Sequence, residues 1–376
     1  MTIKRIQAII PHFTFQGEYV EAVISKSGHI NDTFILHFSL DDGSIRRYVL
    51  QYINSNVFKE PEQVMANIEA VTEHLRMKTL KRGGDPSREA MRIVPTHDGN
   101  SFYRSPQGDY WRAYDFIEGA RTYEMVENPL HFYHAGRAFG QFQLLLSDFP
   151  AHTLHETIAR FHDTRKRFGD FLQAVGADSY GRVEGVQEEI AFILAREGDT
   201  SVIVDLMAQG KVPLRVTHND TKLNNIMIDD QTGEGICVLD LDTVMPGSIL
   251  YDFGDAIRFG ASTALEDETN LDLVSLDLEL FTAYAKGYLS VAHEFLVPAE
   301  VHYLAFSAKL IALELGMRFL TDYLQGDTYF KVDHATHNLD RARTQLKLVA
   351  DMERKMPEME AIITNILKEN TRKDVV

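Results

Sequence analysis

The segment from residue 218 to residue 240 constrains this chain more than any other part of it. It holds Asp220, an asparagine five residues later at Asn225, and a second aspartate, Asp240, at the end of an apolar run. In phosphoryl-transfer sites one aspartate accepts the proton of the attacking hydroxyl, while an asparagine and another aspartate bind the Mg²⁺ that neutralises the nucleoside triphosphate. The pattern therefore predicts a kinase that uses Mg²⁺ and takes ATP as its phosphoryl donor.

The residues around this segment support the catalytic interpretation. Residues 214–216 read as a short strand that enters the loop, residues 225–228 as a strand that leaves it, and residues 229–233 as a turn. A loop held between strands presents its side chains in fixed positions. The competing interpretation is an ordinary surface loop capped by Asp220 and Asn225.

Composition limits the partners of the chain. Its 376 residues, 44% of them hydrophobic, can bury a large core and favour two domains or lobes. A formal charge of -17 disfavours nucleic acids and anionic membranes, because such partners need clustered Lys and Arg. The sequence shows neither a signal peptide nor an apolar run of membrane-spanning length. We therefore expect a cytoplasmic, monomeric protein that binds small molecules.

The single cysteine supports the same compartment. Cys237 cannot form an intrachain disulfide and lies in an apolar strand pattern, so we expect a buried structural thiol.

The order of the predicted elements indicates an α+β fold with two lobes. The first 117 residues predict a small antiparallel-sheet lobe with one main helix, which would bind the nucleotide. Its strands are predicted at residues 20–26, 33–39, 46–52, 91–94, 101–104 and 111–116, and its helix at residues 61–82. Residues 118–376 predict a larger, mostly helical lobe that would hold the catalytic and substrate-binding residues. Its helices are predicted at residues 129–146, 154–175, 185–196, 276–291, 299–324 and 337–368.

Several segments resemble known kinases. Asp240 is followed twelve residues later by the pair Tyr251-Asp252, as in the aminoglycoside phosphotransferase and choline kinase family, a branch of the protein-kinase-like fold. Four segments narrow the resemblance to the bacterial N-acetylhexosamine 1-kinases of that family, namely residues 28–33, 216–226, 240–248 and 316–320. The likeness covers nearly the whole chain. It implies ATP-dependent phosphorylation of the anomeric hydroxyl of N-acetylglucosamine or N-acetylgalactosamine.

The motif residues receive the following expected roles. Asp220 is the candidate base, and Lys222 could offset charge on the γ-phosphate, although a solvated lysine is an equal alternative. Asn225 and Asp240 would bind Mg²⁺ through oxygen. Asp242 could bind a second metal or the substrate, or it could be structural. His218 is expected to brace the loop.

The nucleotide site departs from the wider kinase pattern. The loop expected over the phosphates contains Gly28, Asn31 and Thr33, with one glycine where protein kinases have three. Gln51 occupies the strand position where a lysine is expected, so the usual Lys-Glu ion pair is in doubt. The crossing between the lobes, with Asp115 and Ile117, would offer backbone groups to adenine.

The acceptor site is predicted from fewer signals. Arg318 lies in a segment that is apolar on most of its circumference, where an unpaired guanidinium is costly. It could bind the substrate, or it could form a structural ion pair with Glu314 or Asp322. The resemblance implies sugar-binding roles for four residues: His29, Thr243, Arg318 and Tyr329. Asp220, as the candidate base, is expected to contact the substrate by orienting the sugar hydroxyl.

Other interpretations remain open. A kinase for an amino alcohol or an aminoglycoside is the first alternative, and a catalytically silent nucleotide-binding regulator is the second, which Gln51 favours. Some features are expected to have no role in catalysis. These are the surface histidine pairs His131/His134 and His334/His337, which lack a zinc pattern, and the solvated acidic turn Glu266–Glu268.

Overall fold

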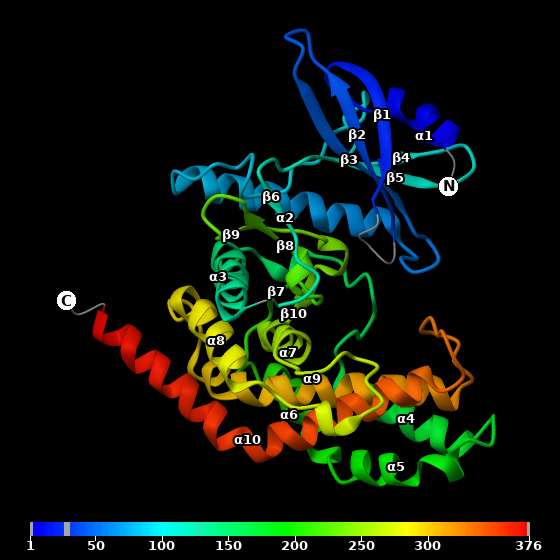
Figure 1. Ribbon diagram of the computed structural model, residues 1–376, viewed down its shortest axis with the longest axis vertical. Coiled ribbons are helices and arrows are strands. Elements are labelled where there is room, and N and C mark those ends of the chain that lie inside the picture. Colours follow the sequence, from blue (N-terminus) through cyan, green and yellow to red (C-terminus); the bar gives the residue numbers. More distant parts are fainter. Residues whose placement is uncertain (1–2, 26–30, 127, 374–376) are drawn as a thin grey trace.

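A twisted antiparallel sheet lies at one end of the molecule and a larger body of helices at the other (Figure 1). The computed structural model describes residues 3–25, 31–126 and 128–373. The sheet has the strand order β1-β2-β3-β5-β4. Its strands are β1 (Glu18–Ile24), β2 (Asp32–Ser39), β3 (Ile45–Ile53), β4 (Tyr103–Arg104) and β5 (Tyr110–Asp115).

Each face of this sheet is covered by a helix. Along β2, buried Phe34, Leu36 and Phe38 alternate with less buried residues, so they share one face. They cluster with Ile6 and Ile9 of the short helix α1 (Ile3–Ile9).

The other face packs on α2 (Pro61–Lys81), whose Val64, Met65 and Ile68 are fully buried. Proline at the first helical position suits the start of α2, since its φ angle is already helical and the missing N–H would have no partner there. Gly83, with a φ of +79°, follows its end, and a left-handed residue of this kind is a common helix stop.

The larger lobe is built from helices in a layered bundle (Figure 1). Two of them, α3 and α8, approach closely because glycines face the opposite backbone. A Cβ atom on Gly136 of α3 would collide with the carbonyl oxygen of Tyr284, and one on Gly287 of α8 with that of Tyr133. The helices are α3 (Pro129–Leu145), α4 (Thr164–Ala177), α5 (Gln187–Leu194), α6 (Val202–Ala208), α7 (Ile249–Gly260), α8 (Leu278–Ala292), α9 (Pro298–Leu324) and α10 (His337–Lys373).

Five short strands lie between the sheet lobe and the helices (Figure 1). They form one two-stranded and one three-stranded antiparallel sheet, with strand orders β10-β7 and β6-β8-β9. Their bounds are Ala120–Arg121 for β6, Arg215–Thr217 for β7, Ile226–Asp229 for β8, Gly235–Val238 for β9 and Met245–Gly247 for β10. The loop from β7 to β8 carries the predicted catalytic residues.

The predicted fold class is confirmed, with local differences. In place of the strand expected at residues 91–94, the structure has an isolated bridge between Ile93 and Tyr114. The strand expected at residues 101–104 is only the two residues of β4. The helix expected from residue 154 begins ten residues later, at Thr164, where the Asp163 side chain accepts a hydrogen bond from the Lys166 amide. The sequence analysis did not predict α1 or α6. Among the described helices, none has the length and apolarity required to cross a bilayer.

Candidate active site

Asp220 lies in the loop after β7, with about a third of its side chain exposed (29%). The Lys222 Nζ atom is 2.8 Å from its Oδ1 atom. Asn225 Nδ2 donates to the Asp220 carbonyl oxygen at 2.9 Å and to its Oδ2 atom at 3.2 Å. A carboxylate held by a cation and an amide yet open to solvent can accept a proton from a bound hydroxyl.

Helix α7 holds this loop from behind. The buried Asp252 carboxylate accepts hydrogen bonds from the backbone N–H groups of His218 and Asn219, at 2.9 Å and 2.8 Å. Gln143 of α3 donates to the same carboxylate at 2.8 Å. Asn219 has a φ of +64°, a left-handed conformation that asparagine tolerates better than most residues. Asp252 of the resemblance pair, in the first turn of α7, therefore fixes the backbone of the candidate catalytic loop.

His218 is fully buried and contacts backbone, in agreement with the bracing role expected for it. Its Nε2 atom is 2.8 Å from the carbonyl oxygen of Leu239, one residue before Asp240. The Thr243 hydroxyl donates to the His218 carbonyl oxygen at 2.6 Å. Thr243 thus has a structural contact, and its predicted role in sugar binding stays a prediction.

Asp240 occupies a left-handed conformation with a φ of +55°, which costs energy for a residue other than glycine and is typical of functional positions. Burial, together with the nearby carboxylates of Asp242 and Asp220, raises the pKa of Asp240 to about 7. A divalent cation would neutralise this group of carboxylates.

The described residues contain no cluster of three or more His, Cys, Asp or Glu side chains arranged to hold a metal. Asn225 and Asp240 nevertheless fit Mg²⁺, which is commonly bound by one or two carboxylates and completed by phosphates and water.

A buried arginine adjoins this site, and the sequence analysis did not identify it. Arg112 of β5 is 1% exposed and forms an ion pair with Asp242. Its Nε atom donates to Gln51 Oε1 at 2.9 Å. Asp242 also accepts from Asn31 Nδ2 at 2.6 Å. Its carboxylate is thus bound by two residues of the sheet lobe.

Only some of the other residues predicted to bind the nucleotide lie in the described part of the structure. Gly28 and His29 lie outside the described residues. Gln51 Nε2 donates to the Thr33 hydroxyl at 3.0 Å. The Asp115 carboxylate is 3.2 Å from Arg46 Nη2. Ile117 is buried in a small apolar cluster at the crossing between the lobes, and it and Asp115 remain candidates for adenine contact.

A second group of residues surrounds a cavity of about 220 Å³ between α4 and α9. The Arg318 guanidinium lies over the rings of Phe161, Tyr329 and Phe330, at 5.3, 5.8 and 5.5 Å from their centroids. Arg167 lines the same cavity. Burial, with the positive charge of Arg318 nearby, lowers the pKa of Arg167. We call this cavity, with its two guanidinium groups, the arginine pocket.

The alternative structural role expected for Arg318 is not supported by its neighbours. Glu314 instead contacts His162, with 2.9 Å between Oε1 and Nδ1. Asp322 accepts backbone hydrogen bonds from residues 328–330 and one from the Asn338 side chain. No ion pair of Arg318 occurs within the described residues, so its charge is available to a ligand.

The pair His162 and Glu314 adjoins both the arginine pocket and α7, because His162 follows Phe161 in the chain and Glu314 precedes Arg318 by one helical turn. The His162 ring lies 4.9 Å from that of Tyr251 in α7, the helix that holds the loop. Two atoms of the pair, His162 Nε2 and Glu314 Oε2, are buried without a hydrogen-bond partner among the described residues. Such atoms are costly to leave unpaired, which marks them as candidate contacts for a bound substrate.

Two expectations about residues without catalytic roles are corrected. His337 is not at the surface, because it is 3% exposed and its Nε2 atom is 3.3 Å from Asp267 Oδ2. Glu266 is not simply solvated, because its Oε1 atom is 2.9 Å from Nη1 of the buried Arg258. Both carry structural contacts that hold the segment after α7 to the helical lobe.

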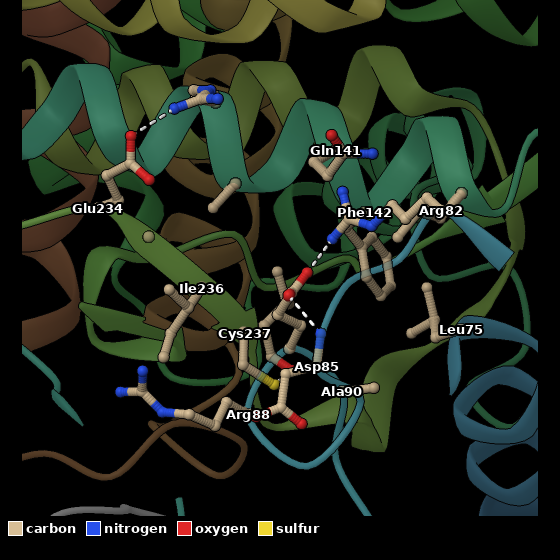
Figure 2. Close-up of a pocket in the computed structure, with 16 residues that line it drawn as sticks. Leu75, Arg82, Asp85, Arg88, Ala90, Gln141, Phe142, Glu234, Ile236 and Cys237 are labelled. Atoms are coloured by element: carbon tan, nitrogen blue, oxygen red, sulfur yellow. Dashed lines mark hydrogen bonds and ion pairs between the residues drawn. The ribbon is translucent and has the colours of Figure 1, made fainter. Parts of the chain in front are cut away.

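A larger cavity, of about 320 Å³, lies between α2, α3 and residues 234–238 of the hairpin that contains β9. Some of its charged side chains pair with one another (Figure 2). Arg82 pairs with Glu89, whose carboxylate also accepts a hydrogen bond from the Asp85 backbone. Arg137 likewise pairs with Glu234. The cavity includes neither Asp220 nor Asp240.

Comparison with known proteins identifies the family. Residues 24–291, more than half of the chain, match the model of the phosphotransferase enzyme family. The chain belongs to this family. It is therefore an ATP-dependent phosphotransferase that acts on a small molecule, and the family match includes the catalytic loop, Asp240 and α7.

Solved structures share the fold at low identity. A microcompartment-associated aminopropanol kinase is 17% identical, with 96% of this chain and 99% of that chain covered and a TM-score of 0.60. An aminoglycoside phosphotransferase from Alicyclobacillus acidocaldarius is 13% identical, with coverage of 97% and 96% and a TM-score of 0.60. An amicoumacin kinase in complex with AMP-PNP and Ca²⁺ is 13% identical, with coverage of 92% and 93% and a TM-score of 0.55.

Proposed function

We propose that this protein is a kinase that transfers the γ-phosphoryl group of ATP to the anomeric hydroxyl of an N-acetylhexosamine. The observation that carries the choice of acceptor is the arginine pocket, where Arg318 has a free charge and Arg167 is a second cation. Guanidinium groups donate several hydrogen bonds in a fixed geometry, which suits the hydroxyl and carbonyl oxygens of an N-acetylated sugar. Aromatic rings beside them suit the apolar face of a pyranose ring.

This placement supports a division of work between the two lobes. Residues 1–117 would hold the nucleotide, and residues 118–376 would supply the base and the acceptor pocket. Mg²⁺, when bound, would neutralise charge on the phosphates. Asn225 and Asp240 would hold that ion. Asp220 would orient the anomeric hydroxyl and accept its proton.

Lys222 lies where it could interact both with the Asp220 carboxylate and with the transferred phosphoryl group. Its Nζ atom already contacts the Asp220 carboxylate, and that contact, with the nearby Asp255, raises the pKa of Lys222 despite burial of the ammonium group. It therefore stays protonated at neutral pH. We propose that it orients Asp220 and stabilises negative charge on the transferred phosphoryl group.

A kinase for an amino alcohol or an aminoglycoside is the second candidate. The similarity to an aminopropanol kinase and to an aminoglycoside phosphotransferase favours it, as does the net charge of -17. A cationic acceptor needs carboxylates or an aromatic cage free of competing cations. Asp170 and Asp322 also line the arginine pocket, but Asp170 pairs with Lys166 and Asp322 accepts backbone hydrogen bonds. Arg318 and Arg167 would therefore oppose the binding of such an acceptor there.

The deciding experiment is a panel of acceptors incubated with ATP and Mg²⁺ and followed by phosphorus NMR. The panel contains N-acetylglucosamine, N-acetylgalactosamine, glucose, choline, ethanolamine, aminopropanol and an aminoglycoside. Asp220→Asn protein is the matched control for contaminating kinases. A phosphorus signal coupled to the anomeric proton of an N-acetylhexosamine supports the proposal, whereas phosphorylation of the amines alone would overturn it.

A further inference from the structure

The core of the sheet lobe contains a charged side chain, Arg112 of β5, to which the proposed function gives no role. All residues from Tyr110 to Tyr114 of β5 are buried, and the third of them is Arg112. Burial of a guanidinium in a central strand is costly unless excellent partners compensate for the lost hydration. An aliphatic residue would fill this position in an ordinary sheet. The arginine therefore calls for an explanation beyond packing.

Its partners come from the sheet lobe and from the segment after β9. Arg112 is directly opposite Gln51 in the antiparallel pairing of β3 and β5, so both side chains lie on the same face of the sheet. Arg112 donates to Gln51 and is ion-paired with Asp242, which belongs to the segment directly after β9. The guanidinium thus joins the nucleotide sheet to the segment that contains Asp240.

The kinase template explains what this arrangement replaces. There, a lysine of the strand equivalent to β3 pairs with a glutamate of the neighbouring helix. Here the strand position holds the uncharged Gln51, and the α2 atom that Arg112 contacts is the Met65 sulfur, 3.9 Å from Nη1. The cation has moved from β3 to β5, and its carboxylate partner has moved from the helix to Asp242.

We propose that Arg112 is a positioning residue that replaces the strand lysine of the kinase pattern. Through Asp242, two residues after Asp240, it fixes the metal-binding aspartate relative to the nucleotide sheet. Asn31, directly before β2, reinforces this contact, because its Nδ2 atom donates to the second oxygen of Asp242 and its Oδ1 atom accepts from the Asn54 amide. The inference is independent of the acceptor.

The test measures nucleotide binding without any acceptor, so it stands apart from the choice of sugar or amine. Calorimetry with AMP-PNP and Mg²⁺ compares wild type with Arg112→Met, which has similar length but no charge. We expect a loss in affinity of about tenfold to a hundredfold, the usual effect of removing a hydrogen-bonded charge. The Mg²⁺ concentration for half-maximal binding should rise as well. Arg104→Met, in the exposed strand β4, is the control.

The double variant Gln51→Lys with Arg112→Met moves the cation to the strand where the template has it. Because positions 51 and 112 are opposite each other, we expect a lysine there to reach Asp242 and restore most of the affinity and of the Mg²⁺ dependence. A double variant that folds but binds no better than Arg112→Met would overturn the proposal. So would an Arg112→Met protein that melts earlier but keeps wild-type affinity and Mg²⁺ dependence.

Folding failure does not leave the question open. Should either variant not fold, Arg112→Lys keeps the charge on β5 and loses only the fork geometry. The proposal requires a positive charge at position 112. Mg²⁺-dependent binding of AMP-PNP by folded Arg112→Lys therefore supports it, and complete loss of that binding overturns it.

Discussion

Replacement of Arg318 by methionine separates the two candidate acceptors. Methionine retains most of the length of the side chain and its contact with the surrounding rings, while the charge is removed. In the folded protein Arg318 has aromatic neighbours and a second cation, Arg167, but no ion pair within the described residues. The substitution therefore leaves no carboxylate unpaired.

The expected magnitudes follow from these contacts. Cation–π contacts at partly exposed sites contribute about 0.5–1 kcal/mol each, and relief of repulsion from Arg167 offsets part of their loss. A net destabilisation of about 1–2 kcal/mol lowers the melting temperature of a large domain by about 2–4 °C. Loss of a charged hydrogen bond to a sugar oxygen costs about 1.5–3 kcal/mol, which raises the sugar KM about tenfold to 150-fold.

Steady-state kinetics with varied sugar and varied ATP, together with thermal melting, tests this prediction. The KM for ATP should stay unchanged, and Arg104→Met serves as the control for removal of an arginine that is 60% exposed and far from the pocket. An Arg318→Met protein with an unchanged sugar KM would refute the role of the pocket. If the acceptor is instead a cationic amine bound there, its KM should fall, because a repulsive charge is gone.

Three further outcomes are expected. Asp220→Asn should keep AMP-PNP binding and lower kcat by about 10²–10⁴, measured with a coupled ADP assay. Burial and the neighbouring carboxylates raise the pKa of Asp240 to about 7 in the metal-free folded protein. Between about pH 4 and pH 7 the folded protein therefore holds a proton at Asp240 that the unfolded chain has lost, so the free energy of unfolding falls as the pH rises through this range. Asp240→Asn should flatten this part of a melting profile recorded without Mg²⁺. Burial raises the pKa of the Cys237 thiol to about 12, so alkylation by iodoacetamide at neutral pH should require unfolding.

Local signals made much of the fold predictable. The helix predicted at residues 61–82 matches α2 closely, because Pro61 and Gly83 mark its ends in the sequence. The order of strands and helices then indicated two lobes. The loop with Asp220 and Asn225 was found because its residues are close in sequence and their chemistry is specific.

Long-range partners explain what the sequence analysis missed. Arg112 sits in a strand pattern that gives no sign of charge pairing, and its partner Asp242 is 130 residues away in the chain. His337 is buried by contacts with the segment after α7, which no local pattern reports. Residues 154–163 have helical spacing, yet the His155 amide donates to the Asn67 side chain of α2, and the helix starts only at Thr164. Each case depends on tertiary contacts that override local propensity.

Part of the arginine pocket lies beyond the segment that matches the phosphotransferase family. The family match ends at residue 291, before Arg318 in α9 and before Tyr329 in the connection from α9 to α10. Arg167 and Phe161, on the other wall of the proposed acceptor pocket, lie within the matched part of the chain. On the proposed function, we expect substitutions in the α9–α10 connection to change the acceptor while Asp220 keeps its contacts with Lys222 and Asn225. A library confined to residues 318–330 would therefore test whether this connection selects the acceptor.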